Sequence, residues 1–97
     1  MDMNYKYKLI YSSQFKKDFK KFIKSGRYDP KKLEIVVELL CKGDILPAKY
    51  RNHRLKGNFM GASECHIEPD WLLIYEKLED TMVLYLMRTG SHGQLFG

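Results

Sequence analysis

Residues 53–75 read HRLKGNFMGASECHIEPDWLLIY, and the second half of this stretch predicts the centre of a β-sheet. Residues 63–68 alternate between apolar and polar side chains, a period typical of a strand with one face on a core. On that strand His66 lies on the face opposite Cys65. Residues 71–78 are apolar enough to form a central strand beside it.

Two further strands are predicted toward the ends of the chain. Residues 4–11 alternate, with tyrosines and a leucine on one face and mainly lysines on the other. Glu79 and Asp80 indicate a hairpin turn that leads from the central strand into a last strand at residues 82–88. Residues 89–97 are punctuated by glycines and carry no strand or helix pattern of their own.

Two amphipathic helices are predicted after the first strand. Ser12 or Ser13 can cap the first helix, and Asp29, followed by proline, opens the second. Glycines at positions 26 and 43 end them. The apolar stripes are Phe15, Phe19, Phe22 and Ile23 in the first helix and Leu33, Val36, Val37 and Leu40 in the second. The short break between them favours a helical hairpin.

The predicted order is therefore β-α-α-β-β-β. This is an α+β domain with a small, mostly antiparallel sheet and the helical hairpin on one face. At 97 residues, the whole chain from 1 to 97 has the length of one domain. No apolar run approaches the ~18 residues of a membrane span, and the N-terminus lacks a signal-peptide core, so we expect a cytoplasmic protein with no membrane partner. Cys41 and Cys65 fall in apolar patterns and are expected to be buried thiols.

Positive charge is concentrated in residues 1–60, which carry a net +9, whereas the remaining residues carry −4. A basic half of this kind suits a polyanion such as nucleic acid, because each neutralised phosphate releases counterions. Solvated helix faces explain the lysines equally well. An irregular loop at residues 43–61 gathers several of these charges together with His53.

The three histidines of the chain can converge on the sheet face that the helices leave open. They are His53, His66 and His92, and Asp70, two residues after Glu68 and next to Trp71, is the carboxylate that we expect to join them. Histidine exchanges protons near neutral pH. A zinc site made from these residues lacks a local spacing such as HExxH, and no GxSxG elbow is present, so neither a metal ion nor another cofactor is expected. Metal-free proton transfer beside a polyanion remains.

RNA suits such a site because its 2′-OH is a built-in nucleophile. Cleavage then needs a base, a cation beside the phosphate and an acid for the leaving 5′ oxygen. Arg88, or the group of Arg51, Arg54 and Lys56, can hold a phosphate, and Phe96 can stack on an unpaired base. A general RNA-binding module has the same inventory, so these residue types alone leave both functions open.

The motifs at residues 53–57, 66–75 and 88–97 closely resemble the YafQ branch of the RelE superfamily, which consists of bacterial type II toxins. The similarity covers nearly the whole chain and implies a RelE-like fold. It also implies an endoribonuclease, or mRNA interferase, that cuts messages in the ribosomal A site. A cognate antitoxin would wrap and inhibit the toxin, and the complex would bind operator DNA.

The resemblance also implies roles for individual residues. The positions that match the family's catalytic set are His53, His66, Asp70 and His92, while Phe96 matches an aromatic near the cleaved phosphate and Arg88 a basic position beside the site. We expect His92 to be the acid, His53 or His66 the base, and Asp70 an orienting or proton-sharing carboxylate. The lysines of the helices are candidates for gripping ribosomal RNA.

One departure from the family lies at Ala62 and Ser63, where many relatives carry a large residue and an arginine. A phosphate contact is then either missing or supplied by Arg54 or Lys56. The departure keeps a second interpretation open: a catalytically silent relative that acts only as an antitoxin-bound co-repressor.

Overall fold

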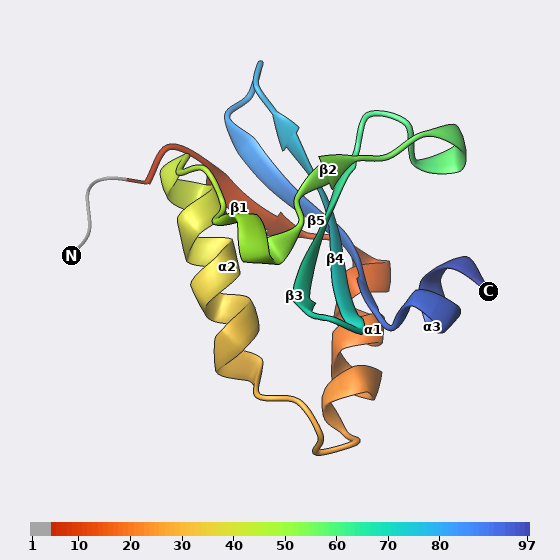
Figure 1. The fold of residues 1–97 in the computed structure, drawn as a ribbon. Helices are drawn as coiled ribbons and strands as arrows, with labels where there is room; N and C mark the ends of the chain where they lie inside the picture. Colours follow the sequence, from red (N-terminus) through yellow and green to blue (C-terminus); the bar gives the residue numbers. More distant parts are fainter. Residues whose placement is uncertain (1–4) are drawn as a thin grey trace.

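The sheet has five strands in the order β1-β5-β4-β3-β2 in a computed structural model, which describes residues 5–97 (Figure 1). The strands are β1 (Lys8–Tyr11), β2 (His53–Arg54), β3 (Ser63–Glu68), β4 (Trp71–Leu78) and β5 (Val83–Gly90). β1 pairs with β5 in parallel, and the other neighbours are antiparallel. The predicted mostly antiparallel sheet and the hairpin turn between β4 and β5 are confirmed.

The two long helices begin at the predicted N-caps, but the first ends at Ile23, earlier than the predicted stop at Gly26. They are α1 (Ser13–Ile23) and α2 (Pro30–Lys42). The Ser12 hydroxyl accepts the α1 N-terminal hydrogen bond at 2.8 Å, and the Asp29 carboxylate does so for α2 at 3.0 Å. Gly43 ends α2 in the left-handed conformation, with φ +84°. Both helices cover the same face of the sheet (Figure 1).

The first strand is shorter than predicted. The backbone N–H groups of Lys6 and Tyr7 donate to the carbonyl of Cys41, at 2.8 and 3.0 Å, so the ladder with β5 begins only at Lys8. Residue 4 of the predicted strand lies outside the described residues. The predicted inward face is also only partly right, because Tyr11 is 46% exposed at the edge of the sheet.

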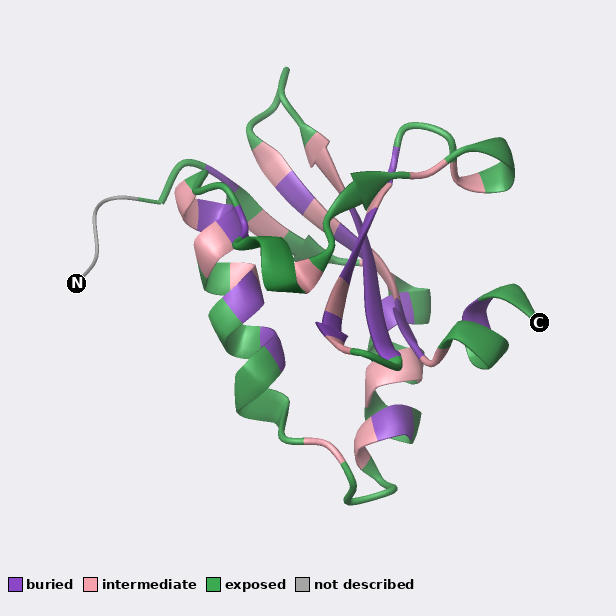
Figure 2. Ribbon diagram, in the orientation of Figure 1, coloured by how far each residue is buried: buried purple, intermediate pink, exposed green. Residues whose placement is uncertain are grey.

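Two apolar cores lie on opposite faces of β4, whose side chains alternate between them. Trp71, Leu73 and Tyr75 face α1 and α2, while Leu72 and Ile74 face the other way. Figure 2 shows the buried residues concentrated in these central strands and on the inner sides of the helices. Both cysteines are buried free thiols, as predicted. No helix within residues 5–97 is long and apolar enough to cross a membrane.

Three short helices and one strand were missing from the prediction. The 3-10 helices are η1 (Ala48–Tyr50) and η2 (Gly57–Phe59), and the helix after β5 is α3 (His92–Phe96). The missing strand is β2, which has two residues, too few for a period. In α3, Ser91 and Gln94 form a reciprocal capping box that overcomes the poor helix propensity of the glycine between them.

Candidate active site

Two of the three histidines meet at one buried carboxylate. His53 and Glu64 are cross-strand partners in β2 and β3, and His66 follows Glu64 by two residues on the same face. Glu64 Oε1 lies 3.2 Å from His53 Nε2 and 3.7 Å from His66 Nε2. The Glu64 side chain is 7% exposed and that of His53 is 50% exposed, so the carboxylate lies beneath the rings.

Backbone carbonyls fix which ring nitrogen faces Glu64. His53 Nδ1 lies 2.9 Å from the Arg51 carbonyl oxygen, and His66 Nδ1 lies 3.2 Å from that of Pro69. A carbonyl can only accept, so Nδ1 carries the proton in both rings. Nε2 is then the basic atom of each neutral ring. A proton on His53 Nε2 would be donated to Glu64 Oε1 across the 3.2 Å contact between these two atoms.

Sequence reasoning missed Glu64 as a member of this site. The signal was available in part, since alternation along β3 places Glu64 on the same face as His66. The missing information was β2, because only its pairing with β3 brings His53 to the same carboxylate.

His92 occupies the start of α3, and Asp70 holds it there. Asp70 Oδ1 accepts a hydrogen bond from the His92 backbone N–H at 3.2 Å, so the carboxylate binds the N-terminus of α3. The imidazole of His92 is exposed, and neither of its ring nitrogens has a hydrogen-bond partner within residues 5–97. Gly90 precedes this turn with φ +152°, and a Cβ there would lie 2.8 Å from Gln94 Oε1.

The turn between β3 and β4 joins these two groups of residues. The carbonyl of Pro69 binds the ring of His66, and the next residue, Asp70, binds the backbone of His92. In the sheet, Leu72 pairs with both His66 and Gly90. Two strand spacings of ~4.8 Å therefore separate His66 from Gly90, about 10 Å, and His92 follows two residues later. The predicted catalytic residues thus gather at one end of the sheet.

Aromatic side chains extend the site from α3. The Phe96 ring is 41% exposed, and its centroid lies 5.1 Å from that of His92 and 5.8 Å from that of Phe59 in η2. Phe96 therefore lies beside a predicted catalytic histidine, where an unpaired base can stack. Phe59 was not predicted, because its loop position carries no pattern.

Arg88 lies apart from the histidines and binds Asp18 of α1. Its Nε and Nη2 donate to the Asp18 oxygens at 2.7 and 3.1 Å, and the Thr89 N–H donates to the same carboxylate at 3.2 Å. Burial alone would raise the pKa of Asp18, but the hydrogen bonds from Arg88, Gln14 and Thr89 outweigh it and lower the pKa. Two guanidinium nitrogens of Arg88 thus bind within the fold, and its phosphate contact stays a prediction.

The other predicted phosphate ligands are exposed. Arg51, Arg54 and Lys56 all present their side chains to solvent around the His53 strand. The departure at Ala62 and Ser63 lies next to them. Ala62 is 1% exposed and packs in the second core under α3, so a larger side chain would need different packing there.

A metal site of the kind weighed above would need at least three ligating side chains around one ion. Within residues 5–97, no group of three or more His, Cys, Asp or Glu side chains is arranged to hold a metal ion.

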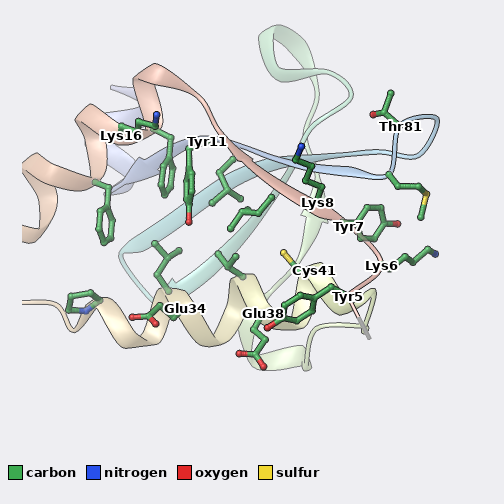
Figure 3. Close-up of a pocket in the computed structure, with 18 residues that line it drawn as sticks. Tyr5, Lys6, Tyr7, Lys8, Tyr11, Lys16, Glu34, Glu38, Cys41 and Thr81 are labelled. Atoms are coloured by element: carbon green, nitrogen blue, oxygen red, sulfur yellow. The ribbon is translucent and has the colours of Figure 1, made fainter. Parts of the chain in front are cut away.

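A large apolar groove lies at the opposite edge of the sheet, between β1, α1 and α2 (Figure 3). Its volume is about 1070 Å³. The floor of the groove consists of Tyr7, Leu9, Phe15, Phe19, Leu33 and Val37. Its rims differ in charge, with Lys6 and Lys8 on the β1 side and Glu34 and Glu38 on α2. β1 and β2 are the two outer strands of the sheet, so the groove and the histidine cluster lie at opposite edges.

Comparisons with known proteins identify the family to which the chain is similar. The family described as "Bacterial toxin of type II toxin-antitoxin system, YafQ" matches residues 7–97. The mRNA interferase toxin YafQ of Escherichia coli K12 is 43% identical over 88 residues, covering 90% of this chain and 92% of that protein.

Solved structures give the same result. The crystal structure of the E. coli DinJ-YafQ complex matches with a TM-score of 0.83 and 38% identity, covering 94% of this chain and 99% of the matched chain. A metal-bound toxin from Helicobacter pylori matches with a TM-score of 0.85 and 38% identity, covering 93% of this chain and 99% of that one.

Proposed function

The chain belongs to the YafQ family of bacterial type II toxins, and we propose that it cleaves messenger RNA in the ribosomal A site by metal-free acid–base catalysis. It is an mRNA interferase, an endoribonuclease that acts as the toxin of a toxin–antitoxin pair. The observation that supports the mechanism is the contact of His53 and His66 with one Glu64 oxygen, at the same end of the sheet as His92.

In this mechanism, His66 is the base. Its Nε2 lies 3.7 Å from Glu64, farther than the Nε2 of His53. The lone pair of the His66 Nε2 is therefore free to take the proton of the 2′-OH. The 2′ oxygen then attacks the adjacent phosphorus. His53 shares its Nε2 proton with Glu64 and acts as the cation beside the developing pentacoordinate phosphate.

His92 acts as the acid. As the bond between phosphorus and the 5′ oxygen breaks, its exposed imidazole gives that oxygen a proton, leaving a 2′,3′-cyclic phosphate and a 5′-hydroxyl end. Asp70 is the positioning residue, because it holds the backbone of His92 at the start of α3. Phe96 stacks on an adjacent base, and Arg51, Arg54 and Lys56 bind the flanking phosphates.

Metal-free catalysis is a separate part of the proposal, since a relative from H. pylori is described as metal-bound. Side chains supply the base, the cation and the acid here, so each step proceeds without a metal ion. Cleavage of a pre-formed ribosome complex is therefore expected to continue when EDTA is added after assembly, and loss of cleavage with recovery on adding zinc or copper would contradict this.

The decisive experiment compares wild type with His92→Ala on ribosomes that carry a defined message. Wild type should cut within the A-site codon, and the variant should cut at least ~100-fold more slowly, the usual scale of a lost general acid. A 2′-deoxy substitution at the scissile nucleotide should abolish cleavage. Absence of A-site cuts with both proteins would instead support the co-repressor interpretation, to which the departure at Ala62 and Ser63 points.

We propose that the apolar groove between β1, α1 and α2 is where the antitoxin binds. A relative forms a complex with DinJ, so a protein partner of this class is expected here. The groove is lined by apolar side chains and has one basic and one acidic rim. An amphipathic helix of the antitoxin fits it if acidic residues flank one side of its apolar stripe and basic residues the other.

The remaining partners follow from the same proposal. Exposed lysines of α1, namely Lys16, Lys17, Lys20 and Lys21, are expected to contact ribosomal RNA. Operator DNA is bound only through the antitoxin complex, and the toxin acts in the cytoplasm, where the ribosomes are. Replacing the four lysines by alanine should weaken co-sedimentation with ribosomes while leaving the fold intact.

A further inference from the structure

A second cavity shares His66 with the candidate active site. It lies between η1, the end of β3 and α2, and its volume is about 670 Å³, within the ~300–1,000 Å³ range of ligand sites. It is lined by Lys32, Ile35, Lys49, Tyr50, Arg51, His66, Ile67, Glu68 and Pro69. We call it the flanking pocket. It forms because β2 pairs with only the first two residues of β3, so η1 lies alongside β3 in place of a longer strand.

The walls of the flanking pocket combine positive charge with apolar and aromatic surface. Lys32, Lys49 and Arg51 are exposed, and the one acidic residue, Glu68, is paired with Lys32 at 3.3 Å. Tyr50 packs its ring against the main core, with Lys49 Nζ 5.2 Å from the ring centroid. Two cations beside a tyrosine suit a phosphate joined to a flat base.

Arg51 connects this pocket to the histidine cluster. Its backbone has φ +49° and ψ +43°, a left-handed conformation that is uncommon for a residue other than glycine. In this conformation its carbonyl binds His53 Nδ1, while its side chain lines the flanking pocket. Arg51 thus contacts both the flanking pocket and the histidine cluster, and His66 belongs to both.

We propose that the flanking pocket binds the nucleotide next to the scissile phosphate in single-stranded RNA. Lys49 and Arg51 bind its phosphate, and the surface of Ile35, Tyr50 and Pro69 receives its base. Since His66 lies between this pocket and Glu64, a nucleotide held here places the neighbouring 2′-OH near His66 Nε2. The inference rests on the proposed RNA cleavage and adds a subsite to it.

Binding is tested with an RNA that cannot be cut. A short single-stranded RNA with 2′-O-methyl groups throughout is titrated into ¹⁵N-labelled protein. Amide signals of residues 49–51 and 66–68 are expected to shift. Lys49→Ala/Arg51→Gln should raise Kd about ten-fold and lower the slope of log Kd against log salt by about 0.7 for each phosphate that the variant no longer binds. The matched control, Lys6→Ala/Lys8→Ala, removes the same charge at the opposite edge of the sheet.

Equal effects of the two double variants would overturn the proposal, because they would show that only overall charge matters. Shifts confined to other parts of the protein would overturn it as well. An acidic peptide of equal charge that shifts the same amides as strongly as the RNA would assign the pocket to a protein partner instead. None of these readouts requires cleavage, so a wild-type protein that binds RNA here yet fails to cut ribosome-bound messages contradicts only the proposed function.

Discussion

The hydroxyl of Tyr75 donates a 2.6 Å hydrogen bond to the side-chain oxygen of Asn52, the residue before His53. Tyr75 is 2% exposed and belongs to the core between the helices and the sheet. Burial raises the pKa of Tyr75 to about 12, so its hydroxyl keeps its proton at physiological pH. The main core thus anchors the exposed loop that carries a predicted catalytic histidine.

Asn52→Ala should therefore lower both stability and activity. Loss of this hydrogen bond is expected to cost about 1 kcal/mol in the free energy of unfolding and to slow cleavage because His53 becomes less well positioned. Tyr7→Phe is the matched control. It also removes a tyrosine hydroxyl, which donates a 2.7 Å hydrogen bond to Glu79, but this bond lies outside the candidate active site. Urea denaturation and single-turnover cleavage are measured. Equal cleavage by the two variants would show that the anchor has no catalytic consequence.

Glu64→Gln should test the role of the histidine cluster without changing the rest of the fold. Glutamine keeps the size of the side chain but cannot hold the negative charge that pairs with His53. We expect cleavage to fall by roughly 100-fold, within the usual range for acid–base groups, with little change in RNA affinity. Glu76→Gln, on β4, is the control, because Glu76 contacts neither histidine. Full activity of Glu64→Gln would exclude a role for the shared carboxylate.

The ion pair between Asp18 and Arg88 should stabilise the fold, and this contribution should depend on pH. Asp18→Asn removes a charged acceptor of four hydrogen bonds, and loss of a hydrogen bond to a charged group typically costs about 1.5–3 kcal/mol. Because the pKa of Asp18 is lowered in the fold, its contribution is present above the unfolded value of 3.8 and is lost as pH falls through the folded value.

The stability difference between wild type and Asp18→Asn is therefore expected at pH 7 and should shrink below about pH 4. Asp80→Asn, in the exposed turn after β4, should show no such difference. Urea denaturation at several pH values measures both. If the Asp18 variant cleaves RNA as well as wild type after correction for its folded fraction, Arg88 serves the fold and not the phosphate.

Val37→Asp should release the toxin from its antitoxin. Val37 lies in the floor of the apolar groove, between Glu34 and Glu38, and a third carboxylate there opposes an apolar helix. Antitoxin affinity should fall by at least ~10-fold, while RNA cleavage by the free toxin stays unchanged. Ile45→Asp is the control, because Ile45 is 94% exposed outside the groove. Calorimetric titration with the antitoxin gives the result, and equal affinities would place the interface elsewhere.

Local patterns predicted the parts of the fold that are long enough to show a period. The helix stripes, both N-caps and the alternation of β3 are examples, because each depends on neighbours within about four residues. β2 is only two residues long and is defined by its pairing with β3, so no local signal identifies it. The helix α3 depends on a capping box in a segment that its glycines mark as a loop.

The same contrast between local sequence signals and long-range contacts applies to the candidate active site. Residue types and the family resemblance identified His53, His66, Asp70 and His92, and the structure brings them to one end of the sheet. Glu64 was missed because its role depends on a strand pairing. The internal contacts of Arg88 were missed because Asp18 is 70 positions away in the chain.

The parallel pairing of β1 with β5 has a consequence for synthesis of the toxin. Residues 8–11 find their partner only in residues 83–86, so the first strand stays unpaired until almost all of the described chain has been translated. The groove that the antitoxin is proposed to fill is bounded by β1 and therefore forms last. The antitoxin must then bind after the ribosome has finished the toxin. An antitoxin already present in the cell therefore has the advantage in the competition with ribosomes for the new toxin.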